Sequence, residues 1–266
     1  MSSRAVVLIM LVLPAAPKGL DAQIDYRNLD DDRPVRVEDA TGIEQDAFEL
    51  LFPYVVEREK AGGFVHAVVP ELAWGVLPNF HVGVKAPVAL RDEAGGTEIG
   101  LSGLRAFALY NFNTEHGALP ALALRVDGEF PVGTHGGSDT RVAVKAIATR
   151  SWGRTRAHVN AAYRVGADGT PSLVESLPRW WAGLALDRTL WRQSLLLIAE
   201  SHVEQGTADA PLAVTAAAGL RWQWTPTTVL DLGVSRGMRA DLGPEVAVTI
   251  GFSHVFALRA LMPGVR

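Results

Sequence analysis

Cysteine is absent from all 266 residues, which excludes disulfides, thiolate metal ligands and a cysteine nucleophile. Proteins exported to an oxidising compartment commonly avoid stray thiols, so this absence fits export. An excess of positive charge is also absent, because the formal net charge is -4 and no compact run of lysine and arginine occurs. Nucleic acid is therefore excluded as a partner, since binding it requires a cationic surface.

Long hydrophobic runs are missing as well. After residue 22 no stretch approaches the ~18 uninterrupted apolar residues of a transmembrane helix, although 48% of the chain is hydrophobic. Any crossing of a membrane must therefore use strands.

The first 22 residues show, in order, the features of a signal peptide. Arg4 gives a basic start, and residues 5–16 form an apolar core that is too short to span a bilayer. Pro17 and Gly19 break any helix, and Ala22 is a small residue at the end of the segment. The sequence predicts export with removal of residues 1–22; the alternative is a buried N-terminal strand.

From residue 48 onward the hydrophobic pattern has a period of two, which is typical of strands whose successive side chains face opposite sides. Leu122 and Leu124, for example, alternate with Arg125 and Asp127. The pattern predicts about twelve strands of about ten residues, the length that a tilted strand needs to cross a bilayer. The predicted strands are 47–56, 64–76, 80–90, 100–112, 118–131, 140–150, 155–165, 179–187, 194–204, 211–224, 229–236 and 245–256.

The connections between these strands alternate between short and long. The short ones are 77–79, 113–117, 151–154, 188–193 and 225–228, and the longer ones are 57–63, 91–99, 132–139, 166–178, 205–210 and 237–244. Bacterial barrels have short periplasmic turns and longer outer loops. The sequence therefore predicts an all-β fold: a closed antiparallel transmembrane β-barrel of about twelve strands in the outer membrane of a Gram-negative bacterium, with both termini periplasmic.

Alternation alone does not say which face points inward, because a soluble barrel has an apolar interior and a membrane barrel an apolar exterior. On the polar face, charged residues recur beside small glycine, alanine and threonine, which favours a lumen. Aromatic residues near strand ends are expected to form the girdles at the membrane interfaces, the alternative being a soluble core. These aromatics are Trp152, Tyr163, Trp180, Trp181, Trp222 and Trp224.

Pro53 and Pro70 fall inside predicted strands. Proline cannot donate to a ladder of hydrogen bonds, and a closed barrel has no free edge. We therefore expect bulges or shortened strands at both positions.

The chain divides into a signal peptide (1–22), a polar arm (23–45), a barrel (46–256) and a tail (257–266). The arm is charged and lacks periodicity, so it is either a periplasmic extension or a segment that folds into the lumen. In the second case passage would require its displacement, and we expect Arg33 and Arg36 to meet lumen carboxylates such as Glu129.

Several motifs together resemble the MetA pathway of phenol degradation family of outer-membrane proteins. The first two are Arg33-Pro34 before Glu38-Asp39-Ala40, and residues 119–125 running into Phe130-Pro131-Val132-Gly133. The others are residues 232–237 and the alternating final strand 248–256, which ends on Phe256. The resemblance implies a barrel that passes small, often hydrophobic or aromatic compounds, and it implies no catalytic residues. One departure is that ten residues follow Phe256, which weakens the signal for the barrel-assembly machinery.

For a channel, charged groups on the small-residue face set which solutes pass. The candidate lumen-lining and selectivity residues are Arg125, Asp127, Glu129, Lys145, Arg156, His158, Glu200 and Arg221. The alternative is that these residues pair across the lumen and close it. The expected partners are outer-membrane lipids, the barrel-assembly machinery and a small solute of unknown identity; no cofactor and no metal is expected.

Two other functions stay open at this point. A sealed structural or adhesive barrel would use its longest outer loop, 166–178, for recognition. A lipid hydrolase would need a serine near a histidine; neighbours on a strand such as Ser201 and His202 point to opposite faces, but His158 could meet a serine on an adjacent strand. The run Asp30-Asp31-Asp32 is interpreted as a solvated acidic linker, and His135 with Asp139 as too few ligands for a metal.

Overall fold

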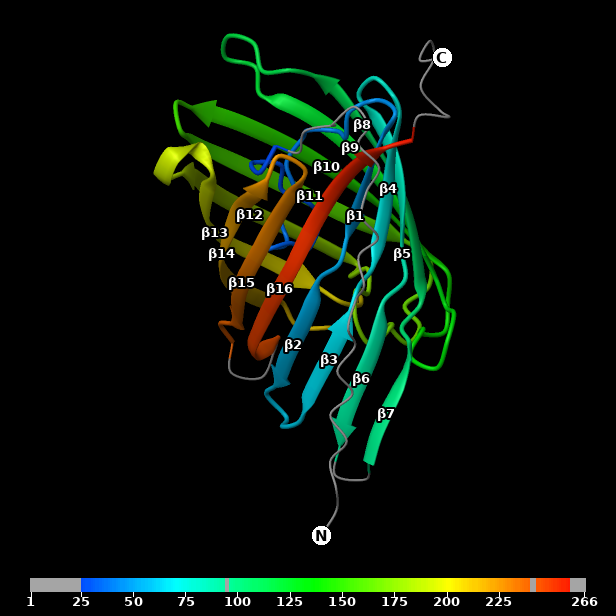
Figure 1. Ribbon diagram of the computed structural model, residues 1–266. Helices are drawn as coiled ribbons and strands as arrows, with labels where there is room; N and C mark the ends of the chain where they lie inside the picture. Colours follow the sequence, from blue (N-terminus) through cyan, green and yellow to red (C-terminus); the bar gives the residue numbers. More distant parts are fainter. Residues whose placement is uncertain (1–24, 94–95, 240–242, 259–266) are drawn as a thin grey trace.

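The computed structural model describes residues 25–93, 96–239 and 243–258 (Figure 1). The broken strands of the first third are β1 (Ala47–Leu51), β2 (Tyr54–Glu59), β3 (Phe64–Val68), β4 (Glu71–Leu77), β5 (Phe80–Lys85), β6 (Val88–Glu93), β7 (Gly96–Leu101) and β8 (Leu104–Asn113). The continuous strands are β9 (Ala121–Phe130), β10 (Arg141–Trp152), β11 (Thr155–Val165), β12 (Trp180–Thr189), β13 (Leu195–Gln205), β14 (Ala213–Thr225), β15 (Thr228–Gly237) and β16 (Pro244–Ala257), with a 3-10 turn η1 (Trp191–Gln193). The predicted signal peptide and residues 259–266 of the predicted tail lie outside the described residues.

The strands form one antiparallel sheet that closes on itself. β16 pairs with β15 on one side and with both β1 and β2 on the other. β1 and β2 are therefore two halves of one wall strand, and β3/β4, β5/β6 and β7/β8 are broken in the same way. Counting each pair once gives a 12-strand barrel, which confirms the predicted fold class.

Prolines cause three of the four breaks. Pro53 separates β1 from β2, Pro70 precedes β4, and Pro87 precedes β6. Proline has no N–H to donate, so regular pairing stops there. Single hydrogen bonds bridge the gap, since the Val69 N–H donates to the Pro53 carbonyl and the Ala86 N–H to the Pro70 carbonyl, both at 3.0 Å. The shortened strands expected at Pro53 and Pro70 are confirmed.

The outer face of the barrel is apolar. Leu124, Val159, Leu184 and Ile250 are between 38% and 56% exposed, although they lie in the middle of long strands. Because the intervening residues on each strand point into the lumen, the alternation of the sequence becomes an apolar outside and a charged inside.

Most of the predicted girdle aromatics lie on this outer face. Trp152, Tyr163, Trp222 and Trp224 are exposed near strand ends, and Trp180 is half-buried. Trp181 is the exception: it is buried in the lumen within an apolar cluster, so its assignment to a girdle was wrong. The alternation along β12 sends it inward.

Residues 25–46 run inside the ring of strands (blue in Figure 1), so the arm folds into the lumen. Tyr26, Leu29, Val35 and Val37 are buried against lumen side chains that include Trp181. Among the residues that the structure describes, no helix is long and apolar enough to cross a membrane.

Candidate functional site

Strand register gathers four cations on the lumen wall. Lys145 of β10 lies opposite Arg125 of β9, and Arg105 of β8 lies opposite Lys85 of β5. None of the four is more than 8% exposed. Buried charges of one sign are costly unless carboxylates compensate them.

Asp31 of the arm supplies a carboxylate that all four cations share. Its Oδ1 is 2.5 Å from Lys145 Nζ, and its Oδ2 is 3.1 Å from Lys85 Nζ. The same Oδ2 lies 3.3 Å from Arg125 and 3.5 Å from Arg105. Burial opposes ionisation, but the four cations, Lys145 foremost, hold the pKa of Asp31 well below its usual range.

Glu38 places a second arm carboxylate beside the first. Its oxygens lie 2.6 Å from Lys145 Nζ and 2.9 Å from Arg125. Asn160 of β11 holds the backbone of the same residue: its amide donates to the Glu38 carbonyl at 2.8 Å and accepts the Glu38 N–H at 2.9 Å. Side chain and backbone of the arm are thus fixed together.

Further wall side chains hold the arm on either side of Glu38. The Val37 N–H donates to Glu200 at 2.7 Å, and the Ala40 N–H donates to Thr149 Oγ1 at 3.0 Å. Asp39 pairs with Arg156 at 3.1 Å, although burial still raises the pKa of Asp39. These bonds satisfy backbone groups that would otherwise be orphaned inside the lumen.

Glycines on the wall make room for the arm. A Cβ built on Gly183 would lie 2.7 Å from Val37 Cγ2, and one on Gly219 would lie 2.7 Å from Pro34 Cγ. A Cβ on Gly233 would overlap the Pro34 carbonyl oxygen. The wall is therefore shaped to receive the arm, which docks where side chains are missing.

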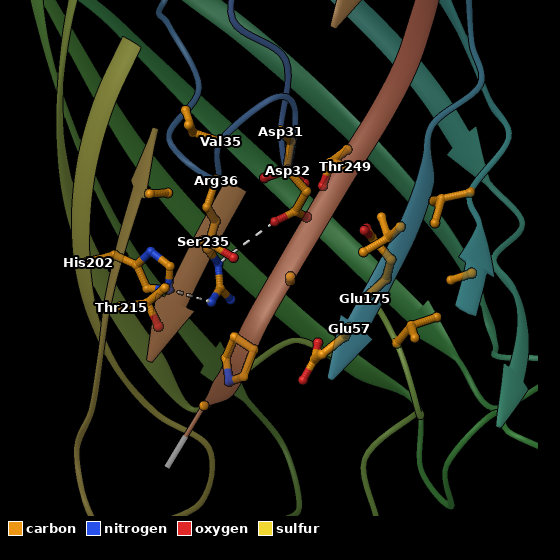
Figure 2. A pocket seen from close by; sticks show the side chains of 18 of the residues that line it. Asp31, Asp32, Val35, Arg36, Glu57, Glu175, His202, Thr215, Ser235 and Thr249 are labelled. Carbon is orange, nitrogen blue, oxygen red and sulfur yellow. Dashed lines mark hydrogen bonds and ion pairs between the residues drawn. The ribbon is translucent and has the colours of Figure 1, made fainter. Parts of the chain in front are cut away.

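The docked arm separates an outer cavity from two periplasmic ones. The outer cavity is about 370 Å³ and lies between the arm, strands β2 and β13 to β16, and residues 173–176 of the longest outer loop. Figure 2 shows Arg36 of the arm in this cavity, between Asp32 and His202. The periplasmic cavities, about 570 and 650 Å³, are lined by Asp25 and Arg27 among others.

The docked arm, residues 25–46, forms a plug in the lumen. The longest outer loop, 166–178, folds inward and helps to hold this plug. Glu175 lies 3.4 Å from both Lys85 and Arg105, which also bind Asp31. Glu129 on the wall accepts a hydrogen bond from the Ser172 hydroxyl at 2.6 Å, which fixes the loop to the lumen wall. The loop that was predicted to carry recognition therefore lies partly inside the barrel, where it contacts lumen side chains.

All eight predicted selectivity residues face the lumen, and each is at most 8% exposed. Those that contact the arm are Arg125, Lys145, Arg156, Glu200 and Arg221. The other three serve the wall and the loop, namely Asp127, Glu129 and His158. Their role in selectivity stays a prediction.

The expected contact of an arm arginine with a lumen carboxylate is confirmed for Arg36, but its partner is Glu204 of β13 and not Glu129. Arg36 pairs with Glu204 at 2.5 Å, and Arg33 lies 3.7 Å from Asp30 within the arm. The other ion pairs that the structure shows between arm and wall have the opposite polarity, with carboxylates from the arm and cations from the wall.

Sequence reasoning missed Asp31, Lys85 and Arg105 as members of the site. The run Asp30-Asp31-Asp32 is not a solvated linker, since Asp31 is 3% exposed. The available signal was the excess of acidic residues in the arm, where residues 23–45 contain seven carboxylates and three arginines.

The histidine singled out for the hydrolase does contact a hydroxyl and a carboxylate. His158 Nδ1 lies 3.0 Å from Thr149 Oγ1, and Nε2 lies 3.0 Å from Asp187. However, Thr149 is 4% exposed and accepts the Ala40 N–H, while Asp187 also pairs with Arg156. Thr149 therefore binds the arm, while His158 and Asp187 hold Thr149 and Arg156, two wall residues that contact the arm.

No metal site is evident in the described part of the chain, where no three histidine, aspartate or glutamate residues converge as ligands would. His135 and Asp139 do not form one: Asp139 instead accepts the Ser138 hydroxyl at 2.6 Å.

Comparison with known proteins gives the fold and no family. No family model matches the chain, and no curated protein matches it. Among solved structures, an outer membrane channel from Pseudomonas putida F1 superposes with a TM-score of 0.61 at 14% identity, over 82% of this chain and 98% of that one. The KdgM porin gives 0.55 at 10% identity, over 78% and 99% of the two chains. The NanC porin gives 0.54 at 10% identity, over 78% and 98%.

These similarities and the apolar outer face make the chain an outer-membrane β-barrel of the kind found in porins and channels. The predicted location in the outer membrane is confirmed. The resemblance to the phenol-degradation family stays a prediction.

Proposed function

We propose that this barrel is a passive outer-membrane channel for small compounds, including aromatic ones, whose lumen is closed by its own N-terminal arm. The observation that carries the proposal is the arm itself. It is a segment separate from the wall, it docks into glycine-lined space, and cavities open on both sides of it.

A sealed structural barrel would have no need of a separable plug with room on either side. The outer cavity has the volume of a small-molecule site, within the usual ~300–1,000 Å³. Apolar groups such as Val69 and Trp181 line it beside charged ones. Lipids would surround the barrel, and the assembly machinery would insert it.

A single substitution tests the channel. Gly233→Val places a side chain where the arm docks, so we expect several-fold higher single-channel conductance in planar bilayers and faster uptake of small aromatic solutes into liposomes. Gly128→Val is the matched control, because Gly128 on β9 faces outward and a Cβ there makes ordinary contacts, with the Phe130 ring at 3.4 Å and the Ala106 carbonyl at 3.9 Å.

Folding of both variants is checked by heat-modifiable migration on gels. A folded Gly233→Val protein with unchanged conductance and uptake would contradict the proposal and favour the sealed barrel.

A further inference from the structure

Without the arm, the four wall cations have fewer carboxylate partners than positive charges. Arg105 and Arg125 share Asp127 at 3.2 and 2.9 Å, and Lys85 has Glu71 at 3.4 Å. The outer loop adds one more carboxylate, from Glu175. Four cations therefore face three carboxylates that do not belong to the arm.

The arm provides the compensation. Asp31 contacts all four cations, and Glu38 contacts Lys145 and Arg125. When the arm leaves, these carboxylates leave with it. The site then has an excess of positive charge in a partly desolvated wall, where a charge-assisted hydrogen bond to an anion is strong.

We propose that Lys85, Arg105, Arg125 and Lys145 form a binding site for a small organic carboxylate, which Asp31 occupies while the channel is closed. The inference rests on the proposed function and names its substrate class. The arm is then an internal competitor: a carboxylate solute replaces the Asp31 side chain, and release of the solute lets the arm dock again.

Aromatic groups beside the cations favour an aromatic acid. The Arg125 guanidinium lies 3.7 Å from the centre of the Phe107 ring, and Lys145 Nζ lies 5.8 Å from the centre of the Trp181 ring. These rings fix the cations and offer an apolar surface next to the carboxylate position. Benzoate therefore matches the site, whereas benzamide has the same shape without the charge.

The direct test is calorimetric titration of the folded, detergent-solubilised protein with benzoate and with benzamide. The variant Asp31→Asn/Glu38→Gln vacates the site, so we expect it to bind benzoate at least ~10-fold more tightly than the wild type, which corresponds to about 1.4 kcal/mol. Benzamide should bind neither protein, and added salt should weaken benzoate binding.

Two further substitutions in the vacated variant locate the site. Lys145→Gln should abolish benzoate binding, because it removes the cation that is nearest to both arm carboxylates. Arg150→Gln should leave it unchanged, since Arg150 lies on the same strand but contacts the turn carbonyls of Gly117 and Leu119. If Asp31→Asn/Glu38→Gln does not fold, Gly233→Val vacates the site with every charge retained.

The outcomes separate this inference from the channel itself. Equal binding of benzoate and benzamide, or equal benzoate affinity in the wild-type and vacated proteins, would overturn the carboxylate site even if conductance rises. Benzoate-specific binding in a protein that never conducts would overturn the channel and leave the site standing.

Discussion

Asp32 shows how a single arm residue can make the stability of the docked arm depend on pH. It lies next to Asp31 and within 3.9 Å of Lys85 and Arg36, on the wall of the outer cavity. Burial, together with the neighbouring charges of Asp31 and Glu175, raises the pKa of Asp32 to about 8, and the cations only partly offset this. A docked arm thus holds a proton that a solvated aspartate releases near pH 4.

Arm docking should therefore weaken with rising pH. Docking takes up a proton between about pH 4 and 8, so the docked state loses stability as the pH rises through this window. We expect open probability in planar bilayers to increase from pH 6 to pH 9 in the wild type. Asp32→Asn should flatten this dependence, and an equally steep rise in that variant would refute the assignment.

At the scale of elements, the outer loops are tied to one another. Asp168 of the loop 166–178 accepts the Ala208 N–H at 3.0 Å and pairs with Arg179 at 3.0 Å. The Ala208 N–H and the Arg164 guanidinium hold the pKa of Asp168 below its usual range. The longest loop is thereby anchored at its outer end, while Glu175 reaches the plug at its inner end.

Removing this tie should free the loop without affecting the barrel. We expect Asp168→Ala to speed limited proteolysis within residues 166–178 by roughly threefold or more, because the loop loses its fixed hydrogen bonds. Asp209→Ala in the neighbouring loop is the control, since Asp209 is exposed and the described structure gives it no polar contact. Equal cleavage rates would show that the tie has no role.

For the molecule as a whole, the apolar outer face favours a surrounding of lipid over one of water. Leu184, near the middle of β12, is 51% exposed and lies opposite Val159, which is equally exposed. Such a pair is stable in lipid but would be an aggregation hazard in water. Tyr163, at the outer end of β11, marks the interface instead.

The loss of stability caused by a charged substitution on the outer face should therefore depend on its depth in the membrane. Leu184→Arg is expected to lower the free energy of unfolding in lipid vesicles by about 2–4 kcal/mol, whereas Tyr163→Arg should cost about 0–1 kcal/mol. Denaturant titration of the protein in vesicles measures both. Similar costs for the two variants would mean that Leu184 does not lie in the hydrocarbon core.

Much of the fold could be predicted because strand alternation is local. A period of two needs only neighbouring residues, so the strand at 155–165 was predicted with its observed bounds, and Arg125 and Lys145 were correctly placed on the inner face. Trp181 was misplaced, since a tryptophan near a strand end suits a girdle or a core equally well. Only its position on β12 relative to the other strands decides.

What the sequence determined by itself is therefore the barrel: its all-β class, its strand number, its apolar exterior and the polar arm before it. Only the tertiary structure decided that the arm fills the lumen and that Asp31 meets cations from four different strands. Those cations lie on four neighbouring wall strands, but the Asp31 that meets them is 54 residues from Lys85 and 114 residues from Lys145 in the chain, and closure of the sheet encloses the arm among them. No local pattern contains that information, because it arises only when the whole ring has formed.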